Sequence, residues 1–370
     1  MIILTILVFI FILGLLVFVH ELGHFIIAKR ARMKVEEFGF GFPPRLFGFK
    51  KGETTYSVNA IPLGGFVKIL GEEGVNDDPR AFANGTFGAR LATLLAGVGM
   101  NFVLGWVLLL IGFAFVGVPV GIEQGADIGN ARISQAHLTV VAVQAGSPAE
   151  RAGFKHGDAI LAIDNVTFTD IESMIAYNQA HLGQTETYKL QRGREVIFRD
   201  VEPRVNPPPG SGPVGFEPAI IANATYPFGE ALRLSLAAFM DKASAIFVAF
   251  GQLIRNLVGT GKLAEGLSGP VGIAVLTKDF ATLGLIYLVQ FTAILSINLG
   301  IINAMPFPAL DGGRVLFLII EKIRGAKSLK LESHANTIGF ILLLVLMAAV
   351  TFNDIGRFSE QFKRLFERIL

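Results

Sequence analysis

The chain has 370 residues, of which 52% are apolar and only 17% are charged. This low share of charge, together with long uncharged runs, indicates an integral membrane protein. The formal net charge of +2 gives no reason to expect nucleic acid as a partner. The absence of cysteine excludes disulfides, a thiol nucleophile and thiolate metal ligands, so any metal would be held by His, Asp or Glu.

The first apolar segment, predicted to span the membrane over residues 1–28, contains no charged side chain before position 20. It ends in the sequence H-E-L-G-H at positions 20–24. Residues four apart share one face of a helix, so His20 and His24 can both reach one metal ion, and Glu21 could take a proton from a water that the metal holds. Ionisable groups at the edge of the hydrocarbon are costly and are functional candidates. The alternative is a chance match whose histidines extend to the membrane interface.

Three further segments are long enough to cross the bilayer, namely 91–122, 281–305 and 333–353. Four spans is therefore the simplest count. A fifth apolar stretch, roughly 231–258, contains charged residues and has its apolar side chains mostly on one side. We expect it to be an amphipathic helix on the membrane surface, within a connecting region that covers 206–280.

The distribution of positive charge predicts the orientation of these spans. Four basic residues follow the first span between positions 29 and 34, and the positive-inside rule therefore places residues 29–90 in the cytosol. The region from 123 to about 278 is then outside, and residues 306–332 return to the cytosol. The tail, 354–370, lands outside, although it is basic and fits the rule poorly.

Within the cytosolic region, the stretch 54–70 has two β-prone runs on either side of P-L-G-G at positions 62–65. This pattern predicts a β-hairpin. The stretch is too apolar for an ordinary exposed loop, and a hairpin that dips toward the membrane is permitted where its backbone bonds are satisfied within protein. The alternative is a surface hairpin unrelated to catalysis.

Residues 126–205 differ in composition from the rest of the chain. They alternate β-rich runs with turns and contain one short helical segment near 171–180, which predicts a small soluble α+β domain inserted between the second and third spans. The proline-rich stretch 206–213 that follows is expected to be a stiff linker.

Two histidines do not complete a catalytic zinc site, which needs three protein ligands and an open position for water. The histidines of the inserted domain lie on the wrong side of the membrane, so Asp311 is the better third candidate. Pro306 and Pro308 interrupt the third span just before it, and broken backbone at membrane depth is tolerated only around a protein-lined or water-filled cavity. Spacing alone leaves Asp311 as either a ligand or a cap for a helix that begins near Gly312.

In their order along the chain, these motifs resemble the site-2 protease family, and most closely its bacterial regulator-of-sigma-factor type of intramembrane metalloprotease. The run N-x-x-P-x-P-x-L-D-G-G that begins at Asn303 completes the pattern. Residues 146–153 and 157–160 are similar to the PDZ modules of these proteases. Residues 64–67 resemble their membrane re-entrant β-loop, and 267–272 resemble a segment before the third span. Some members carry two PDZ modules, whereas we find one.

The resemblance implies a polytopic α-helical membrane protein with a re-entrant β-hairpin and an inserted, extracytoplasmic (periplasmic) PDZ-like domain. It implies that His20, His24 and Asp311 hold Zn²⁺ and that Glu21 is the general base. It also implies that Asn303 contacts the substrate backbone or steadies the oxyanion. The predicted substrate-binding positions are Asn303, Pro306, Pro308, Gly64 and Gly65, and an edge strand around 57–69 could capture an extended substrate by strand addition.

The implied substrates are single-pass membrane proteins, such as a pre-cleaved anti-sigma factor or a signal-peptide remnant, within the bilayer of a bacterial inner membrane. The PDZ-like domain would either bind the free C-terminus that a site-1 protease leaves or act as a size filter. The filter is slightly favoured, because no carboxylate-binding loop can be identified from the sequence.

Interpretations from other classes have weaker support. The run G-L-S-G at 266–269 matches the serine motif of rhomboid-type proteases, but Ser268 stands outside any apolar run and His334 is predicted at the opposite face. A transporter could use the same ionisable groups as an ion path, yet the chain has no internal repeat. A PDZ scaffold without protease activity is disfavoured by the intact H-E-L-G-H motif.

Overall fold

The computed structural model describes residues 2–72, 74, 76–122, 129–193, 195–260, 268–325 and 329–357. The chain divides into two compact units. The larger unit contains residues 1–108, 237–278 and 291–370, and the smaller one contains 109–236 and 279–290.

Five helices of the described residues are long and apolar enough to cross a membrane, judged by length and composition. Four of them overlap the predicted spans, and the fifth is the stretch predicted to lie on the membrane surface. The five are α1 (Ile2–Arg30), α2 (Phe87–Ile111), α5 (Phe228–Thr260), α7 (Leu285–Ala304) and α9 (Leu329–Arg357).

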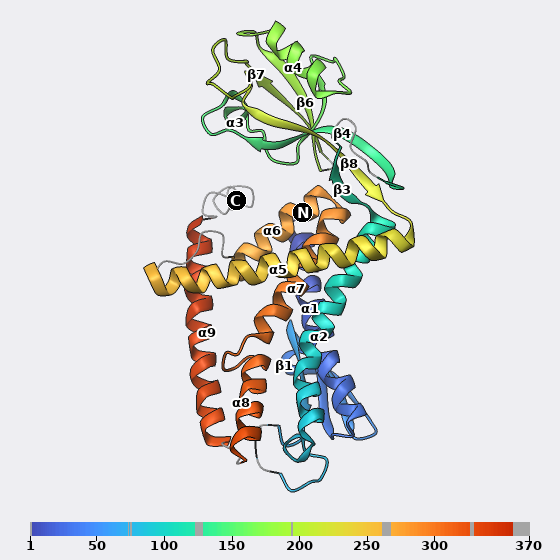
Figure 1. Ribbon diagram of the computed structural model, residues 1–370, viewed down its shortest axis with the longest axis vertical. Helices are drawn as coiled ribbons and strands as arrows, with labels where there is room; N and C mark the ends of the chain where they lie inside the picture. The colour runs from blue at the N-terminus through green and yellow to red at the C-terminus, as the bar shows by residue number, and fades with distance from the viewer. Residues whose placement is uncertain are drawn as a thin grey trace. The chain divides into compact units, whose positions relative to one another are not determined.

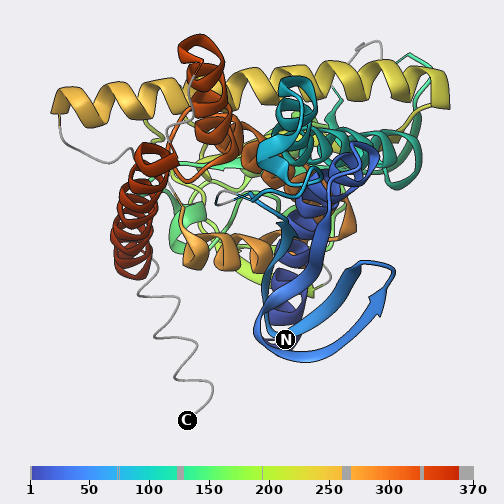
Figure 2. The same cartoon turned by 90° about the horizontal axis from the view of Figure 1, so that it is seen from below.

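The part of α5 that belongs to the larger unit, from residue 237 onward, lies across the direction of α9 (Figures 1 and 2). A helix in the membrane interface and a helix that spans the bilayer lie crosswise in this way. The surface location of α5 stays a prediction, since its length and composition also allow it to span.

The bounds of two predicted spans differ from the structure. Helix α2 ends at Ile111 and continues as one π-helical turn, Gly112–Val116, after which Gly117 has a φ of 98° and strand β3 (Val118–Gly121) begins. The predicted span 91–122 therefore included residues that pair in a sheet. The predicted span 281–305 is divided at Gly284, between α6 (Pro270–Leu283) and α7. Of the predicted tail, residues 354–357 belong to α9, and 358–370 lie outside the described residues.

The β-hairpin predicted within 54–70 is wrong in its position. Residues 54–69 form one strand, β2 (Thr54–Ile69), and its partner is β1 (Val35–Lys51), so the chain reverses near Gly52, where φ is 64°. At 62–65 the strand continues without reversing, and the ring of Phe42 packs where Gly64 lacks a side chain. Proline and glycine mark a bend in a strand as readily as a turn, which is why the pattern was misleading.

Each strand is bent, so that one segment of β1 pairs with two segments of β2, and one segment of β2 pairs with two segments of β1. Phe38 pairs with Val67 on one side and with Tyr56 on the other, and Tyr56 also pairs with Phe49. The order across the sheet is therefore 45–51, 54–59, 35–42 and 61–69, with 61–69 at one edge. Figure 2 shows the two strands (blue) as a long ribbon that extends away from α1.

The sheet rests on α1 through aromatic contacts. The ring of Phe38 lies 4.9 Å from that of Phe25 and 5.6 Å from that of Phe18, measured between centroids. The ring of Phe40 lies against Gly14 of the same helix, where a Cβ atom would come within 2.9 Å of it. The sheet is thus held along the helix that carries the histidine motif.

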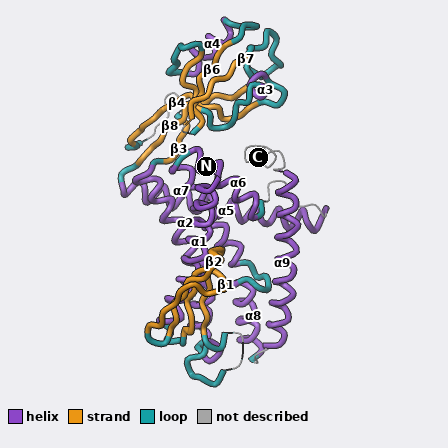
Figure 3. The backbone as a smooth tube through the Cα atoms, turned by 180° about the vertical axis from the view of Figure 1, so that it is seen from behind, coloured by secondary structure: helices purple, strands orange, loops and turns teal. Residues whose placement is uncertain are grey.

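The inserted domain is a six-stranded antiparallel sheet in the order β3-β8-β4-β5-β6-β7. Figure 3 shows these strands (orange) with α3 and α4 beside them. The predicted β-rich runs and the helix at 171–180 are all present. Besides β3, the elements are β4 (Arg132–Val143), α3 (Pro148–Arg151), β5 (Ala159–Ile163), α4 (Ile171–Ala180), β6 (Glu186–Arg192), β7 (Glu195–Val201) and β8 (Phe216–Thr225).

The predicted domain limits, 126–205, are too narrow at both ends. Strand β8 follows the proline-rich stretch and pairs between β3 and β4, so 206–213 is a loop inside the domain and not a linker that leaves it. The amide of Arg204 donates to the carbonyl of Pro213 at 3.0 Å and closes this loop. A run of prolines suggested a linker because composition cannot reveal that the chain returns to the same sheet.

Candidate metal centre

The end of α1 places two histidines on one face of the helix. His20 is 7% exposed, and the side chain of His24 is 12% exposed. Their Nε2 atoms lie 3.2 Å apart. The four-residue spacing that predicted a shared face therefore does bring the two rings together.

Asp311 is the first residue of α8 (Asp311–Arg324), which follows the break after α7. Leu310 is the N-cap residue of α8, and no side chain makes the capping hydrogen bond. The carboxylate of Asp311 instead points to the histidines, so the alternative in which Asp311 serves as a cap is wrong.

The two glycines after Asp311 allow the broken segment to fold tightly against the start of α8. A Cβ atom at Gly312 would lie 2.2 Å from the carbonyl oxygen of Ala304, and one at Gly313 would lie 2.1 Å from that of Phe307. Any side chain at either position would push the segment away, and Asp311 with it.

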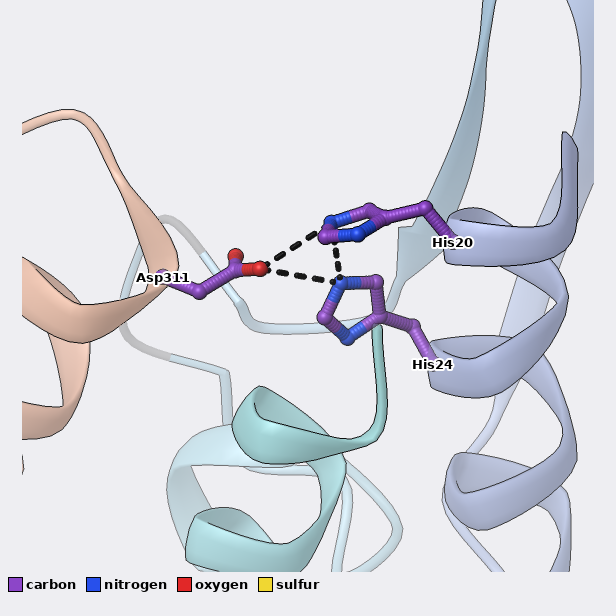
Figure 4. Close-up of side chains that lie close together, drawn as sticks. All are labelled: His20, His24 and Asp311. Atoms are coloured by element: carbon purple, nitrogen blue, oxygen red, sulfur yellow. Dashed lines mark hydrogen bonds and ion pairs between the residues drawn. The ribbon is translucent and has the colours of Figure 1, made fainter. Parts of the chain in front are cut away.

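The three side chains converge in the larger unit (Figure 4). Oδ2 of Asp311 lies 3.0 Å from Nε2 of His20 and 3.4 Å from Nε2 of His24. Among the described residues, these three side chains form the cluster of histidine and carboxylate groups whose atoms lie close enough together to bind one metal ion. The structure thus joins the H-E-L-G-H helix to a residue near the other end of the chain.

The geometry of this cluster fits zinc. Ligand atoms at tetrahedral zinc lie about 3.3 Å apart when the bonds are about 2.0 Å, and the three separations here, 3.0, 3.2 and 3.4 Å, are close to this value. Oδ2 of Asp311 is buried and lacks a hydrogen bond of good geometry, as a ligand atom would. Two imidazoles and one carboxylate form the ligand set of a catalytic site with an open position.

Helix α2 contributes residues that the sequence analysis missed. Nδ1 of His24 lies 2.7 Å from the carbonyl oxygen of Thr93, and Nδ1 of His20 lies 3.0 Å from Nδ2 of Asn101. Between them, Gly97 leaves room for both rings, since a Cβ atom there would lie 2.3 Å from Nε2 of His24. Positions 93, 97 and 101 recur every four residues, a spacing of small and polar residues that marks a helix contact and could have revealed this face.

Glu21, the predicted base, lies on α1 beside the edge segment of β2. A Cβ atom at Gly65 would be 3.5 Å from Cγ of Glu21 and 3.1 Å from the carbonyl oxygen of Gly39. Gly64 is buried next to it. The missing side chains at 64 and 65 therefore let the strand pass close to Glu21.

The other predicted substrate-contact residues surround the break between α7 and α8. Asn303 is half-buried on the last turn of α7, Pro306 is exposed and Pro308 is half-buried. Asn303 is not one of the three clustered side chains, and its role stays a prediction.

The segment between α7 and α8 is held by α9. The amide of Ala309, whose φ of 73° is unusual for a residue other than glycine, donates to Oδ1 of Asn336 at 3.1 Å. Gly339 allows α9 to approach Pro308, whose carbonyl oxygen would be 2.5 Å from a Cβ atom at 339.

Two ion pairs fix α8 to other parts of the larger unit. Arg314 donates to Glu72, which follows β2, at 2.6 Å. Arg90 at the start of α2 makes two hydrogen bonds to Glu321, at 2.8 and 2.9 Å, and its side chain is 11% exposed. Paired bonds of this kind define orientation as well as distance, so they support the position of Asp311.

The rhomboid-like alternative is not supported. The amide of Gly269, next to Ser268, donates to Asp354 near the end of α9, whereas His334 lies in the first turns of the same helix. The 20 residues from 334 to 354 correspond to about 30 Å of helix, so Ser268 and His334 do not form a catalytic pair.

Comparison with known proteins gives a consistent result. Residues 8–346 match the model of peptidase family M50. A Clostridium acetobutylicum protein named for zinc metalloprotease activity is 38% identical, over 92% of this chain and 94% of its own length. The regulator of sigma-W protease RasP of Bacillus subtilis is 32% identical over 95% and 98%, and the zinc metalloprotease RasP of Geobacillus kaustophilus is 31% identical over 96% and 98%.

Among solved structures, the PDZ domain of an SdrC-like protein from Listeria monocytogenes aligns with 24% of this chain and 92% of its own length. The sequence identity is 20% and the TM-score is 0.21. A likeness at that TM-score does not define the fold of the inserted domain.

Proposed function

Because this chain belongs to peptidase family M50 and is a zinc metalloprotease, we propose that it hydrolyses a peptide bond within the transmembrane segment of single-pass membrane proteins. The observation that carries this proposal is the convergence of His20, His24 and Asp311 at the end of an apolar helix long enough to span a membrane. Family membership also argues against the transporter and the inactive scaffold.

In this proposal, His20, His24 and Asp311 hold the zinc ion. Zinc, when bound, supplies a Lewis acid that polarises the scissile carbonyl and lowers the pKa of a water to about 7. Glu21 takes the proton from the attacking water and delivers it to the leaving amide nitrogen. Asn303 on the last turn of α7 contacts the substrate backbone or donates to the developing oxyanion.

The substrate helix must be opened before hydrolysis, because its carbonyls are engaged in internal hydrogen bonds. Among the described residues, the edge segment 61–69 of β2 pairs with 35–42 on one side only, and it passes close to Glu21 at Gly65. We propose that an extended substrate segment adds to this edge as a further strand. Gly64 and Gly65 allow its backbone to approach, and the break at Pro306 and Pro308 borders the same site.

Proline substitutions test the strand addition, because proline cannot donate a ladder hydrogen bond. We expect either Phe66→Pro or Val67→Pro to slow cleavage strongly, because successive amides of a strand point to opposite sides and only one of these two faces outward. The unfolding temperature of each variant controls for damage to the sheet. Wild-type rates in every proline variant across 57–69 would show that the edge is not used.

The inserted domain contains a groove of about 830 Å³ between α4 and the start of β8. Met174, Ile175 and Asn178 line it from the helix, and Gly215 and Phe216 line it where the strand begins. A groove between a strand edge and a helix suits an extended peptide terminus. It favours a receptor for the C-terminus that a first protease leaves, over the size filter that sequence alone slightly favoured.

A matched pair of substitutions separates the receptor from the filter. Ile175 is 40% exposed in the groove, and Val166 is 43% exposed outside it. We expect Ile175→Arg, but not Val166→Arg, to slow cleavage of a pre-cut substrate with a free C-terminus. If both variants cleave that substrate at the wild-type rate, the groove is not a receptor and the filter is the better proposal.

The placement of the site and the names of the relatives support the proposed substrate class. The name of the Bacillus subtilis relative, regulator of sigma-W protease, supports a pre-cleaved anti-sigma factor as one substrate, and signal-peptide remnants have the same single-span form. We place the protein in a bacterial inner membrane, with the metal centre toward the cytosol and the inserted domain outside. The pattern of positive charge supports this orientation.

The decisive experiment compares wild type and Glu21→Gln, purified in detergent, on a single-span test substrate. Glutamine keeps the shape of the side chain and both histidines while removing the base. We expect the wild type to cut within the span and the variant to lose at least about 100-fold in kcat, with its zinc content unchanged. Equal cleavage by both proteins would refute the role of Glu21.

A further inference from the structure

Asn101 is a buried polar residue of α2 to which the proposed reaction assigns no role. Its residue exposure is 0%, although it lies in an apolar helix. Its side-chain amide reaches Nδ1 of His20 at 3.0 Å. Burying an amide is unfavourable unless it is well paired, so the contact with His20 is the physical reason for an asparagine here.

The neighbouring histidine shows which contact a metal ligand requires. The carbonyl oxygen of Thr93 can only accept, so Nδ1 of His24 carries a hydrogen, and in the neutral ring Nε2 then keeps its lone pair. That lone pair faces the cluster with Asp311. The contact on Nδ1 therefore selects the ring form in which Nε2 can bind zinc.

For His20 the same requirement fixes the orientation of the Asn101 amide. If Nδ2 faces Nδ1 of His20, the ring must accept there, and its hydrogen moves to Nε2, where the metal would bind. If the amide turns by 180°, Oδ1 accepts from Nδ1–H, and Nε2 is free as a ligand atom. Both orientations occupy the same space, and Oδ1 makes no other hydrogen bond in the structure.

We propose that Asn101 is a positioning residue for zinc, whose amide oxygen accepts the Nδ1 hydrogen of His20 and so presents Nε2 of His20 to the metal. Three successive turns of α2 then serve the two histidines. The Thr93 carbonyl orients His24, Gly97 leaves space for both rings, and Asn101 orients His20. This inference rests on the proposed zinc ligands.

The backbone of Asn101 has a separate structural role, which lets the side chain be tested alone. The hydroxyl of Ser296 on α7 donates to the carbonyl oxygen of Asn101 at 2.7 Å. A substitution of the side chain leaves this contact between α2 and α7 in place. Asn101→Leu removes the acceptor at similar volume, and Asn101→Asp keeps it.

The experiment measures zinc affinity by competition with a chelator, using full-length protein in detergent. We expect Asn101→Leu to bind zinc about 10- to 100-fold more weakly than the wild type, as typically follows the loss of a partner that orients a histidine ligand. We expect Asn101→Asp to bind within a few-fold of the wild type, because a carboxylate also accepts from Nδ1–H. Val103→Ala, on an exposed position of the same helix, is the control and should bind normally.

Asp311→Ala distinguishes a failure of the proposed zinc ligand set from a failure of the role proposed for Asn101. If Asp311→Ala loses zinc while Asn101→Leu binds as the wild type does, the role of Asn101 is wrong and the ligand set stands. If neither substitution weakens zinc binding, the ligand set is wrong as well. Equal loss in Asn101→Leu and Asn101→Asp also overturns the inference, and the unfolding temperature of the zinc-free proteins identifies any loss of fold.

Discussion

Gly97 determines how closely α2 can approach the histidines of α1. A Cβ atom at this position would lie 2.3 Å from Nε2 of His24 and 2.7 Å from Nε2 of His20. These atoms belong to rings that are buried and held by other contacts, so they cannot move aside easily. Gly97 is important because it has no side chain, and a motif defined by reactive side chains does not include such a position.

We predict that Gly97→Ala abolishes zinc binding or weakens it at least about 10-fold, because the added methyl group displaces the ligand atoms. Gly99 is the matched control on the same helix, since a Cβ atom there has no neighbour within 4 Å. Zinc content per protein, measured after dialysis, checks both variants. Normal zinc content in Gly97→Ala would mean that α2 does not hold this position in the folded protein.

Glu186 is a buried carboxyl group in the inserted domain. It is 0% exposed, and neither carboxyl oxygen has a hydrogen bond of good geometry. Burial raises the pKa of Glu186 from 4.5 to about 7, against the opposing effects of Tyr188 and His181, while Asp164 adds to the increase. The folded domain therefore favours the protonated form.

The sign of the pH effect follows from this raised pKa. The protonated form contributes stability that is fully present below pH 4.5 and is lost as the pH rises through about 7. We predict that Glu186→Gln, which stays neutral, stabilises the inserted domain at pH 8.5 by about 2 kcal/mol relative to the wild type and has little effect at pH 5. Hydrogen exchange of β6 amides in the full-length protein, compared between the two proteins at each pH, measures this. Equal protection at pH 8.5 would contradict the prediction.

At the scale of elements, α9 is attached at two places in the larger unit. Near its start, Asn336 and Gly339 hold the segment that leads to Asp311. Near its end, Asp354 is 0% exposed, and its Oδ2 accepts from the amides of Gly269 and Gly272 at 2.9 and 2.7 Å. Asp354 thus caps the N-terminus of α6 from a different helix, a position where a carboxylate is favourable.

We predict that Asp354→Ala lowers the free energy of unfolding by about 1–3 kcal/mol, because two buried amides lose their acceptor. Asp354→Asn retains an oxygen acceptor and should lose less. The exposed neighbour Asn353→Ala should leave stability unchanged. Thermal unfolding of the detergent-purified protein distinguishes these outcomes, and an unchanged midpoint for Asp354→Ala would show that this cap does not stabilise the fold.

At the scale of the whole molecule, the chain is a multi-pass membrane protein with an inserted domain. The positive-inside rule assigns the segment after the first span to the cytosol and the inserted domain to the outside. The chain contains no cysteine, so a single introduced cysteine reports its own side of the membrane without interference.

We predict that a membrane-impermeant maleimide labels Glu195→Cys in intact spheroplasts and labels Asp77→Cys only after the membrane is opened. Both positions are exposed, Glu195 on β7 of the inserted domain and Asp77 after β2. Activity of each variant confirms that the fold is retained. Labelling in the reverse order would invert the proposed orientation.

Local sequence patterns were sufficient to predict many of the helices and strands of this protein. The histidine pair, the apolar helices and the strands of the inserted domain depend on spacings of a few residues, which sequence preserves. The helix at Ile171–Ala180 was predicted with its bounds. By contrast, the hairpin at 54–70 and the linker at 206–213 were misread, because Pro and Gly are compatible with a bend, a loop or a linker, and only distant pairing decides among them.

The sequence by itself determined that two histidines and a glutamate share the end of an apolar helix, since residues four apart in a helix necessarily share a face. It left Asp311 divided between a cap and a ligand. Only the tertiary structure excluded the cap, because the packing of α8 brings the carboxylate to the histidines. The Gly312–Gly313 pair and the ion pairs of Arg314 and Arg90 hold α8 in place. The contacts of Gly97 and Asn101 with the histidines are also visible only in the tertiary structure, since the partner of a helix face depends on packing between distant segments.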